Sequence, residues 1–364
     1  MASHTVENAV WTVVVPLLGV FAVAASLSGM IPQGNVIVAL CVTLLLGACV
    51  FSAVHHAEVI AAKLGEPYGS IILALAVTVL EAGLILSLMV SAGENGNTIA
   101  RDTVYSAIMI ITTGIVGVSL LLGNRRHFEQ SIRIRGTSSA LSVLVVLAVI
   151  TLILPNYTQT TAGPTYSNLQ LIMVALTSLL LYCAFLFVQT VRHRDYFLSD
   201  TIDADGDPQN GPTLKTFWSS TIFLCAALFA VIMLAKSLSS VLTNMITSIG
   251  LPLSFTGVII AAMVLLPEGI AATRAALANR LQVSINLALG SGLATIGLTI
   301  PVVAMADIFG NFDIALGISP SQTVLLVLAL FTSSITLATG RTNILFGVVH
   351  LSIFAMFLLI SAIP

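Results

Sequence analysis

The stretches VTVLEAG (residues 77–83) and VLLPEG (residues 264–269) each place one glutamate within a long run of uncharged residues. Glu81 is the only charged residue between residues 67 and 93, and Glu268 also follows a long uncharged run. A charged group in the middle of a membrane-spanning helix costs several kcal/mol, so it is a functional candidate by default. The other acids fall in predicted loops or at the edges of predicted spans. These two stretches therefore predict membrane helices that each carry a functional acid.

The composition places most of the chain in a lipid bilayer. Hydrophobic residues make up 57% of the sequence and charged residues only 8%, against about 25% charged residues in ordinary soluble domains. The net charge is -2 and no basic run is longer than Arg125-Arg126, so nucleic acid is not an expected partner. The four cysteines show no CxxC or Cys/His spacing, and neither disulfides nor zinc are expected.

Stretches of about 20 apolar residues, the length of a membrane-spanning helix, occur eleven times. They lie near residues 11–29, 35–54, 68–90, 103–122, 137–155, 168–190, 217–235, 253–273, 285–305, 321–338 and 343–362. Each is predicted to be helical, because a backbone exposed to lipid must satisfy its own hydrogen bonds. The first has no basic segment before it and no clear cleavage site, so we expect it to be retained. The sequence thus predicts an all-α polytopic membrane protein.

The basic residues predict the orientation of these spans. With the N-terminus in the cytoplasm, every Lys and Arg falls on the cytoplasmic side except Arg101 and Lys236, as the positive-inside rule requires. An odd number of spans then puts the C-terminus outside. We expect the protein in the cell inner (plasma) membrane.

The spans divide into one, five and five. The predicted segments are a first transmembrane helix (1–30), a five-helix repeat (31–190), an acidic cytoplasmic loop (191–216) and a second five-helix repeat (217–364). The aspartates of this loop suggest a calcium sensor, but the loop lacks the spacing and closing Glu of an EF-hand, so a solvated linker is expected.

The two sets of five spans share a weak internal similarity. A Gly-x-Pro triplet precedes each acid (65–67 and 250–252), and a serine follows each at a similar distance, Ser106 in the first half and Ser291 in the second. Because five is odd, the second set enters the membrane from the opposite side. The repeats are therefore predicted to be inverted, with the two acids meeting near the midplane.

Oxygen ligands surround both acids in the sequence. The candidates are Glu81, Glu268, Ser106 and Ser291, with Thr78 and Thr295 as further hydroxyls. Hard cations prefer carboxylate, carbonyl and hydroxyl oxygens. Pro267 removes one helical hydrogen bond, which predicts either a broken helix or a simple kink beside Glu268. The alternative for each acid is a protonated structural contact between helices.

A carboxylate binds either a proton or a metal cation, so the two compete for one site. If only loaded forms reorient across the membrane, this competition becomes exchange driven by the proton gradient. The sequence therefore predicts a transporter of inorganic cations and protons, with no cofactor and no enzymatic activity, and it leaves homo-oligomer formation open. A cation channel is the alternative from another class, but a channel does not need inverted halves around one site.

Histidines provide weaker signals. His55, His56 and Glu58 resemble a metal cluster, but a membrane metalloenzyme would need further ligands that the sequence does not offer. A role in gating or pH sensing and a solvated helix edge remain the two interpretations. His350, inside the last span, fits either a proton relay or a packing role.

Five motifs give the chain a recognisable family resemblance. They are LGEPYG (64–69), VLEAG (79–83), LLPEGIAA (265–272), NLALGSGLATIGLTIPV (286–302) and TGRTNILFGVVHL (339–351). The chain resembles the calcium/cation antiporter superfamily, in its cation/proton exchanger branch, and is most similar to the bacterial ChaA type.

The resemblance implies a fold of one plus five plus five helices and an ion site to which each repeat contributes one acid, here Glu81 and Glu268. Many cation/proton exchangers carry a Gly-Asn-x-x-Glu pattern at both acids, and this chain does not. Calcium is the first cation that the resemblance suggests. Sodium or potassium exchange at the same site is the alternative, because the ChaA type is associated with those ions as well.

Overall fold

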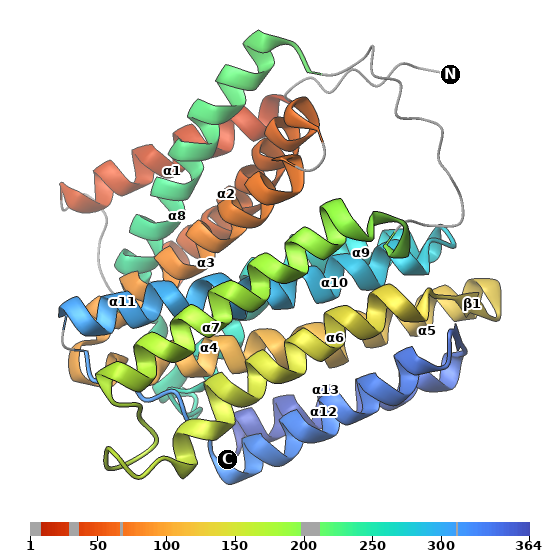
Figure 1. Cartoon of the computed structure of the whole chain (residues 1–364). Helices are drawn as coiled ribbons and strands as arrows, with labels where there is room; N and C mark the ends of the chain where they lie inside the picture. Colours follow the sequence, from red (N-terminus) through yellow and green to blue (C-terminus); the bar gives the residue numbers. More distant parts are fainter. Residues whose placement is uncertain (1–8, 29–35, 66–67, 198–211, 311) are drawn as a thin grey trace. The chain divides into compact units, whose positions relative to one another are not determined.

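The computed structural model describes residues 9–28, 36–65, 68–197, 212–310 and 312–364, which are largely helical (Figure 1). Within these ranges, eleven helical segments are long and apolar enough to cross a membrane, which confirms the predicted all-α polytopic fold. The chain divides into two compact units, one formed by Met1–Ala92 with Asp203–Met245 and the other by Gly93–Ile202 with Ile246–Pro364. Most of the predicted acidic loop, and Glu66-Pro67 of the first triplet, lie outside the described residues.

The described residues of the first unit form a bundle of four helices. They are α1 (Val10–Leu27), α2 (Val36–Leu64), α3 (Tyr68–Ala92) and most of α8 (Leu214–Ser248). Small residues allow close packing: a Cβ atom on Gly19 of α1 would lie 2.7 Å from the sulfur of Cys49 in α2. Ser87 of α3 donates a hydrogen bond to the carbonyl of Ile232 in α8, at 3.0 Å.

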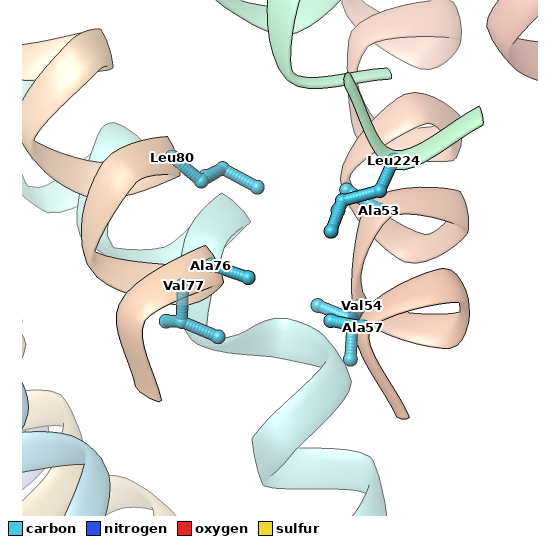
Figure 2. Close-up of a pocket in the computed structure, with 7 residues that line it drawn as sticks. All are labelled: Ala53, Val54, Ala57, Ala76, Val77, Leu80 and Leu224. Atoms are coloured by element: carbon cyan, nitrogen blue, oxygen red, sulfur yellow. The ribbon is translucent and has the colours of Figure 1, made fainter. Parts of the chain in front are cut away.

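Apolar side chains line a small gap between α2, α3 and α8 (Figure 2). Ala53, Val54 and Ala57 of α2 face Ala76, Val77 and Leu80 of α3, with Leu224 of α8 beside them. The remaining gap has no room for a water molecule. The α3 residues in this contact come directly before Glu81 in the sequence.

The second unit contains the remaining elements. Its helices are α4 (Ile99–Met109), α5 (Val116–His127), α6 (Ile134–Ala148), α7 (Asn168–Phe187), α9 (Phe255–Leu277), α10 (Leu281–Ala294), α11 (Ile300–Gly310), α12 (Pro320–Ala338) and α13 (Ile344–Ala362). Short 3-10 helices are η1 (Gly93–Gly96), η4 (Leu154–Tyr157) and η6 (Arg194–Tyr196). Strands β1 (Gln130–Ser131) and β2 (Arg341–Thr342) pair antiparallel, with Gln130 opposite Thr342.

In the part of this unit that the structure describes, four π-helical segments interrupt or extend the spans. They are η2 (Ile110–Ile115), η3 (Val149–Ile153), η5 (Val188–Arg192) and η8 (Thr295–Thr299). Two of them, η2 and η8, have an α-helix on both sides, within the spans Ile99–His127 and Leu281–Gly310. Single π-turns within α-helices occur frequently at functional sites, and these two follow Ser106 and Ser291 by one helical turn.

Helices α4 and α9 cross at a glycine. A Cβ atom on Gly257 would lie 2.6 Å from the backbone carbon of Asp102, closer than real side chains come. Further along, α9 continues through Pro267 to Leu277, so the helix is not broken beside Glu268. The α4–α9 crossing therefore depends on a residue without a side chain, as is usual between membrane helices.

We predict that Gly257→Ala destabilises the protein by about 1–3 kcal/mol, the usual cost of overpacking a tight interface. The added methyl group meets backbone atoms of α4, which cannot move aside as a flexible side chain could. The midpoint of thermal unfolding in detergent should fall. Gly47→Ala is the control, because nothing lies within 4 Å of its Cβ position and alanine favours the helix. An equal or higher midpoint for Gly257→Ala would show that the crossing tolerates a side chain.

Candidate functional site

The second unit brings two of the predicted site residues together. Glu268 lies in the middle of α9 and Ser291 near the end of α10. The Ser291 hydroxyl donates a hydrogen bond to Oε2 of Glu268 at 3.0 Å. Both residues are half-buried. A hydrogen bond to a carboxylate is stronger than one between neutral groups, and it fixes the direction in which the carboxylate points.

The π-helical segment η2 packs against the residues that follow this pair. A Cβ atom on Gly269 would lie 3.4 Å from the side chain of Ile115, and one on Gly292 would lie 3.4 Å from Ile111. Ile115 and Ile111 of η2 thus lie at ordinary van der Waals distance from the Cβ positions of the two glycines that follow Glu268 and Ser291. Three segments, α9, α10 and η2, therefore determine the geometry around the pair.

Further hydroxyl groups lie in these spans. Ser106 of α4 is buried and donates to the carbonyl of Asp102 at 2.6 Å, and Thr295 is buried one turn after Ser291. A hydroxyl that donates to a carbonyl keeps its oxygen lone pairs. The Ser106 oxygen is thus still chemically able to bind a cation.

Glu81 and Thr78 lie on α3 in the first unit. Glu81 is only 2% exposed, and Thr78 is buried and donates to the carbonyl of Ala74 at 2.8 Å. A carboxylate removed from water needs a proton, a cation or strong donors. The pairing of Glu81 with Glu268 stays a prediction.

The histidine cluster on α2 is divided between two environments. His56 is fully buried, and its Nε2 atom donates to the carbonyl of Thr12 at 2.8 Å. The His55 ring lies 6.1 Å from that of Trp11, and Glu58 is exposed. No group of three or more His, Cys, Asp and Glu side chains within the described ranges is arranged to hold a metal ion. A role in gating or pH sensing stays a prediction.

One polar feature near the predicted site, the Arg101–Asp102 ion pair, was not identified from the sequence. Asp102, expected at the edge of a span, is buried in the first turn of α4 and forms an ion pair with Arg101 at 2.9 Å. Arg101 also donates to the carbonyl of Gly317 at 3.2 Å. The adjacency of the two charges was the available signal, but adjacency alone does not show burial.

The buried ring of His350 on α13 contacts two other spans. Its Nδ1 atom lies 2.7 Å from the carbonyl oxygen of Thr112, and its Nε2 atom lies 3.1 Å from the hydroxyl of Thr336. Of the two interpretations left open by the sequence, this geometry gives the packing role direct support. The sequence could not reveal that the contacted carbonyl belongs to a π-helical segment.

The site thus offers carboxylate and hydroxyl oxygens, a ligand set suited to hard cations and protons.

Comparison with known proteins agrees with this chemistry. A family described as sodium/calcium exchanger protein matches residues 34–191 and 219–363. The chain is 47% identical to the protein y4hA of Sinorhizobium fredii over 354 residues, covering 97% of this chain and 96% of that protein.

The sodium-potassium/proton antiporter ChaA of Escherichia coli is 38% identical over 329 residues, with 89% of each protein covered. Among solved structures, the Ca²⁺/H⁺ antiporter protein YfkE superposes with a TM-score of 0.73 at 16% identity, over 96% of this chain and all of that one. These findings agree with the family that the sequence motifs resemble. The chain belongs to the sodium/calcium exchanger protein family of cation antiporters.

Proposed function

We propose that this protein exports a cytoplasmic cation in exchange for protons, by alternating access at a site to which Glu81 and Glu268 each contribute a carboxylate. The observation that carries the proposal is the hydrogen bond from Ser291 to Glu268 inside a membrane span. Ser106, Thr78 and Thr295 complete the proposed set of oxygen ligands. Membership of an exchanger family supports the same function.

Several features support the proposal of two inverted five-helix repeats, residues 31–190 and 217–364. The family matches two separate segments close to these bounds. Gly65 and Gly250, which follow the first helix of each repeat, both have a positive φ, 66° and 76°, the usual way to end a helix. A π-helical segment follows the serine of each repeat. Similar local geometry at corresponding places is what a duplicated unit would produce.

The proposed mechanism is competition at the two carboxylates. Protons arriving from outside neutralise them, and cytoplasmic cations displace the protons when the site opens inward. A bare carboxylate in a dry site is costly, so reorientation of the empty, ionised site is unfavourable. Exchange then follows without nucleotide or redox chemistry. We propose the inner membrane as the location, with the N-terminus in the cytoplasm and the C-terminus outside, because this places nearly all Lys and Arg inside.

Calcium is the proposed first substrate, because two carboxylates can neutralise one divalent cation. Sodium or potassium is the second candidate, and a specific observation favours it: the 38% identical relative is named a sodium-potassium/proton antiporter. Both use the same oxygen site, which contains the same proton-binding groups.

We predict that purified protein in sealed vesicles releases internal protons when the cation is added outside, and that Glu81→Gln and Glu268→Gln each abolish this release. An amide neither carries the negative charge nor exchanges a proton near neutral pH. Glu129→Gln is the matched control, since Glu129 is exposed and its carboxylate forms a long 3.7 Å contact with the exposed Arg341. Wild-type rates in both site variants would remove the assignment.

Ser291→Ala should raise the half-saturating cation concentration about tenfold, the effect expected when one hydrogen bond to a charged group is lost. The carboxylate of Glu268 then loses its fixed direction. Ser291→Thr keeps a hydroxyl and should stay closer to wild type. Initial rates over a range of cation concentrations measure this, and equal affinity in the alanine and wild-type proteins would exclude Ser291 from the site.

Calcium should saturate exchange at a lower concentration than sodium or potassium in the same vesicles. Lowering the external pH should raise the half-saturating concentration of each cation, because protons occupy the same carboxylates. If sodium or potassium saturated exchange at a lower concentration than calcium does, the protein would be assigned as a monovalent cation/proton exchanger instead. Affinity independent of pH would argue against competition at one site.

A further inference from the structure

The π-helical segment η2 leaves one backbone carbonyl without its usual donor. The N–H of Val116 bonds the carbonyl of Ile111, five residues back. In a regular α-helix this N–H would bond Thr112, four residues back. Thr112 is fully buried within a membrane span, where a carbonyl without a donor is strongly unfavourable. A side chain from elsewhere must satisfy it.

His350 supplies that donor from α13. Its Nδ1 atom lies 2.7 Å from the Thr112 oxygen, and since a carbonyl only accepts, Nδ1 must carry the proton. The opposite ring atom, Nε2, lies 3.1 Å from the Thr336 hydroxyl of α12. Both nitrogens therefore have partners, and the ring is fixed between η2 and α12.

Two glycines make this contact geometrically feasible. A Cβ atom on Gly117 of α5 would lie 3.1 Å from Cβ of His350. A Cβ atom on Gly347 of α13 would lie 2.5 Å from the backbone nitrogen of Leu121. Without side chains at these positions, the α5 and α13 backbones approach closely enough for an imidazole ring to reach a main-chain carbonyl.

The segment held by His350 also packs against Gly269 and Gly292, the residues that follow Glu268 and Ser291. Ile115 of η2 lies against Gly269 and Ile111 against Gly292. If η2 returned to regular α-helical hydrogen bonding, the residues on one side of it would shift by one position along the helix relative to those on the other side. This corresponds to a rotation of about 100° at 3.6 residues per turn. Such a rotation would remove Ile111 and Ile115 from the two glycines.

We propose that His350 is a positioning residue for cation exchange, which holds η2 in its π-helical form and thereby maintains the cation-binding geometry at Glu268 and Ser291. The inference rests on the proposed function of that pair. His350 acts through η2 and does not touch the carboxylate. Its substitution should therefore weaken cation binding more than it slows the maximal rate of exchange.

The test compares wild type, His350→Ala, His350→Asn and Thr336→Val in the vesicle assay, with calcium and sodium as the probes. His350→Ala should raise the half-saturating concentration about tenfold while the maximal rate changes less than about twofold. His350→Asn places an amide N–H near the Nδ1 position and should restore most of the affinity. Thr336→Val keeps the bond to Thr112 and should differ little from wild type.

Hydrogen–deuterium exchange of the backbone in residues 110–117 gives a readout that does not depend on transport. These amides should exchange faster in His350→Ala than in wild type or His350→Asn. If His350→Ala does not yield monodisperse protein, His350→Gln replaces it, because its longer amide reaches toward Thr336 and not Thr112.

Unchanged exchange protection and unchanged affinity in the alanine variant would overturn the proposal. An equal loss of cation affinity in His350→Ala and His350→Asn would also overturn it. An N–H donor to the Thr112 carbonyl would then not be enough to maintain cation binding. Wild-type protein without cation/proton exchange would refute the proposed function. The deuterium measurement would still decide whether His350 holds η2.

Discussion

The structure depends on one constraint of the bilayer: every backbone polar group in a span must find its partner within the protein. Regular helices meet this constraint by themselves, and most of the chain is built that way. The constraint becomes informative where the helix departs from regularity. At η2 the Val116 N–H bonds Ile111, and the carbonyl left over at Thr112 is satisfied by a histidine from another helix. A local irregularity thus requires a specific tertiary contact.

The lipid bilayer also changes which interactions hold the helices together. Apolar side chains gain little by moving from lipid to protein, so close approach and van der Waals contact matter more than burial. Glycines provide that approach at Gly257 between α4 and α9 and at Gly347 between α13 and α5, where an added Cβ atom would meet backbone atoms. Gly269 and Gly292, next to Glu268 and Ser291, have ordinary contact distances to η2 at their Cβ positions. The close helix crossings therefore depend on Gly257 and Gly347.

The sequence predicted the number and position of the spans because apolar runs of membrane length are a strong signal. It predicted helix ends less well: α2 continues to Leu64 and α8 to Ser248, beyond the apolar runs that ended near residues 54 and 235. Hydropathy detects only the part of a helix in lipid, whereas the hydrogen-bonded helix continues past it. Glu268 and Ser291 were each recognisable from pattern. The π-turns and the His350 contact were not, because both depend on which backbone carbonyl lacks a donor.

A carboxylate inside a membrane protein, away from water, is stable in three conditions: when it is protonated, when it binds a cation, or when several donors bond to it. Glu268 receives one hydrogen bond from Ser291, which orients the group but does not replace the hydration of a full charge. The pair is therefore better suited to binding a proton or a cation than to remaining ionised and empty. With further donors, Glu268 could remain ionised as a structural residue without exchanging ligands. One donor among the described residues orients the carboxylate and still leaves it dependent on a ligand. Under the proposed function, that dependence would couple proton and cation transport.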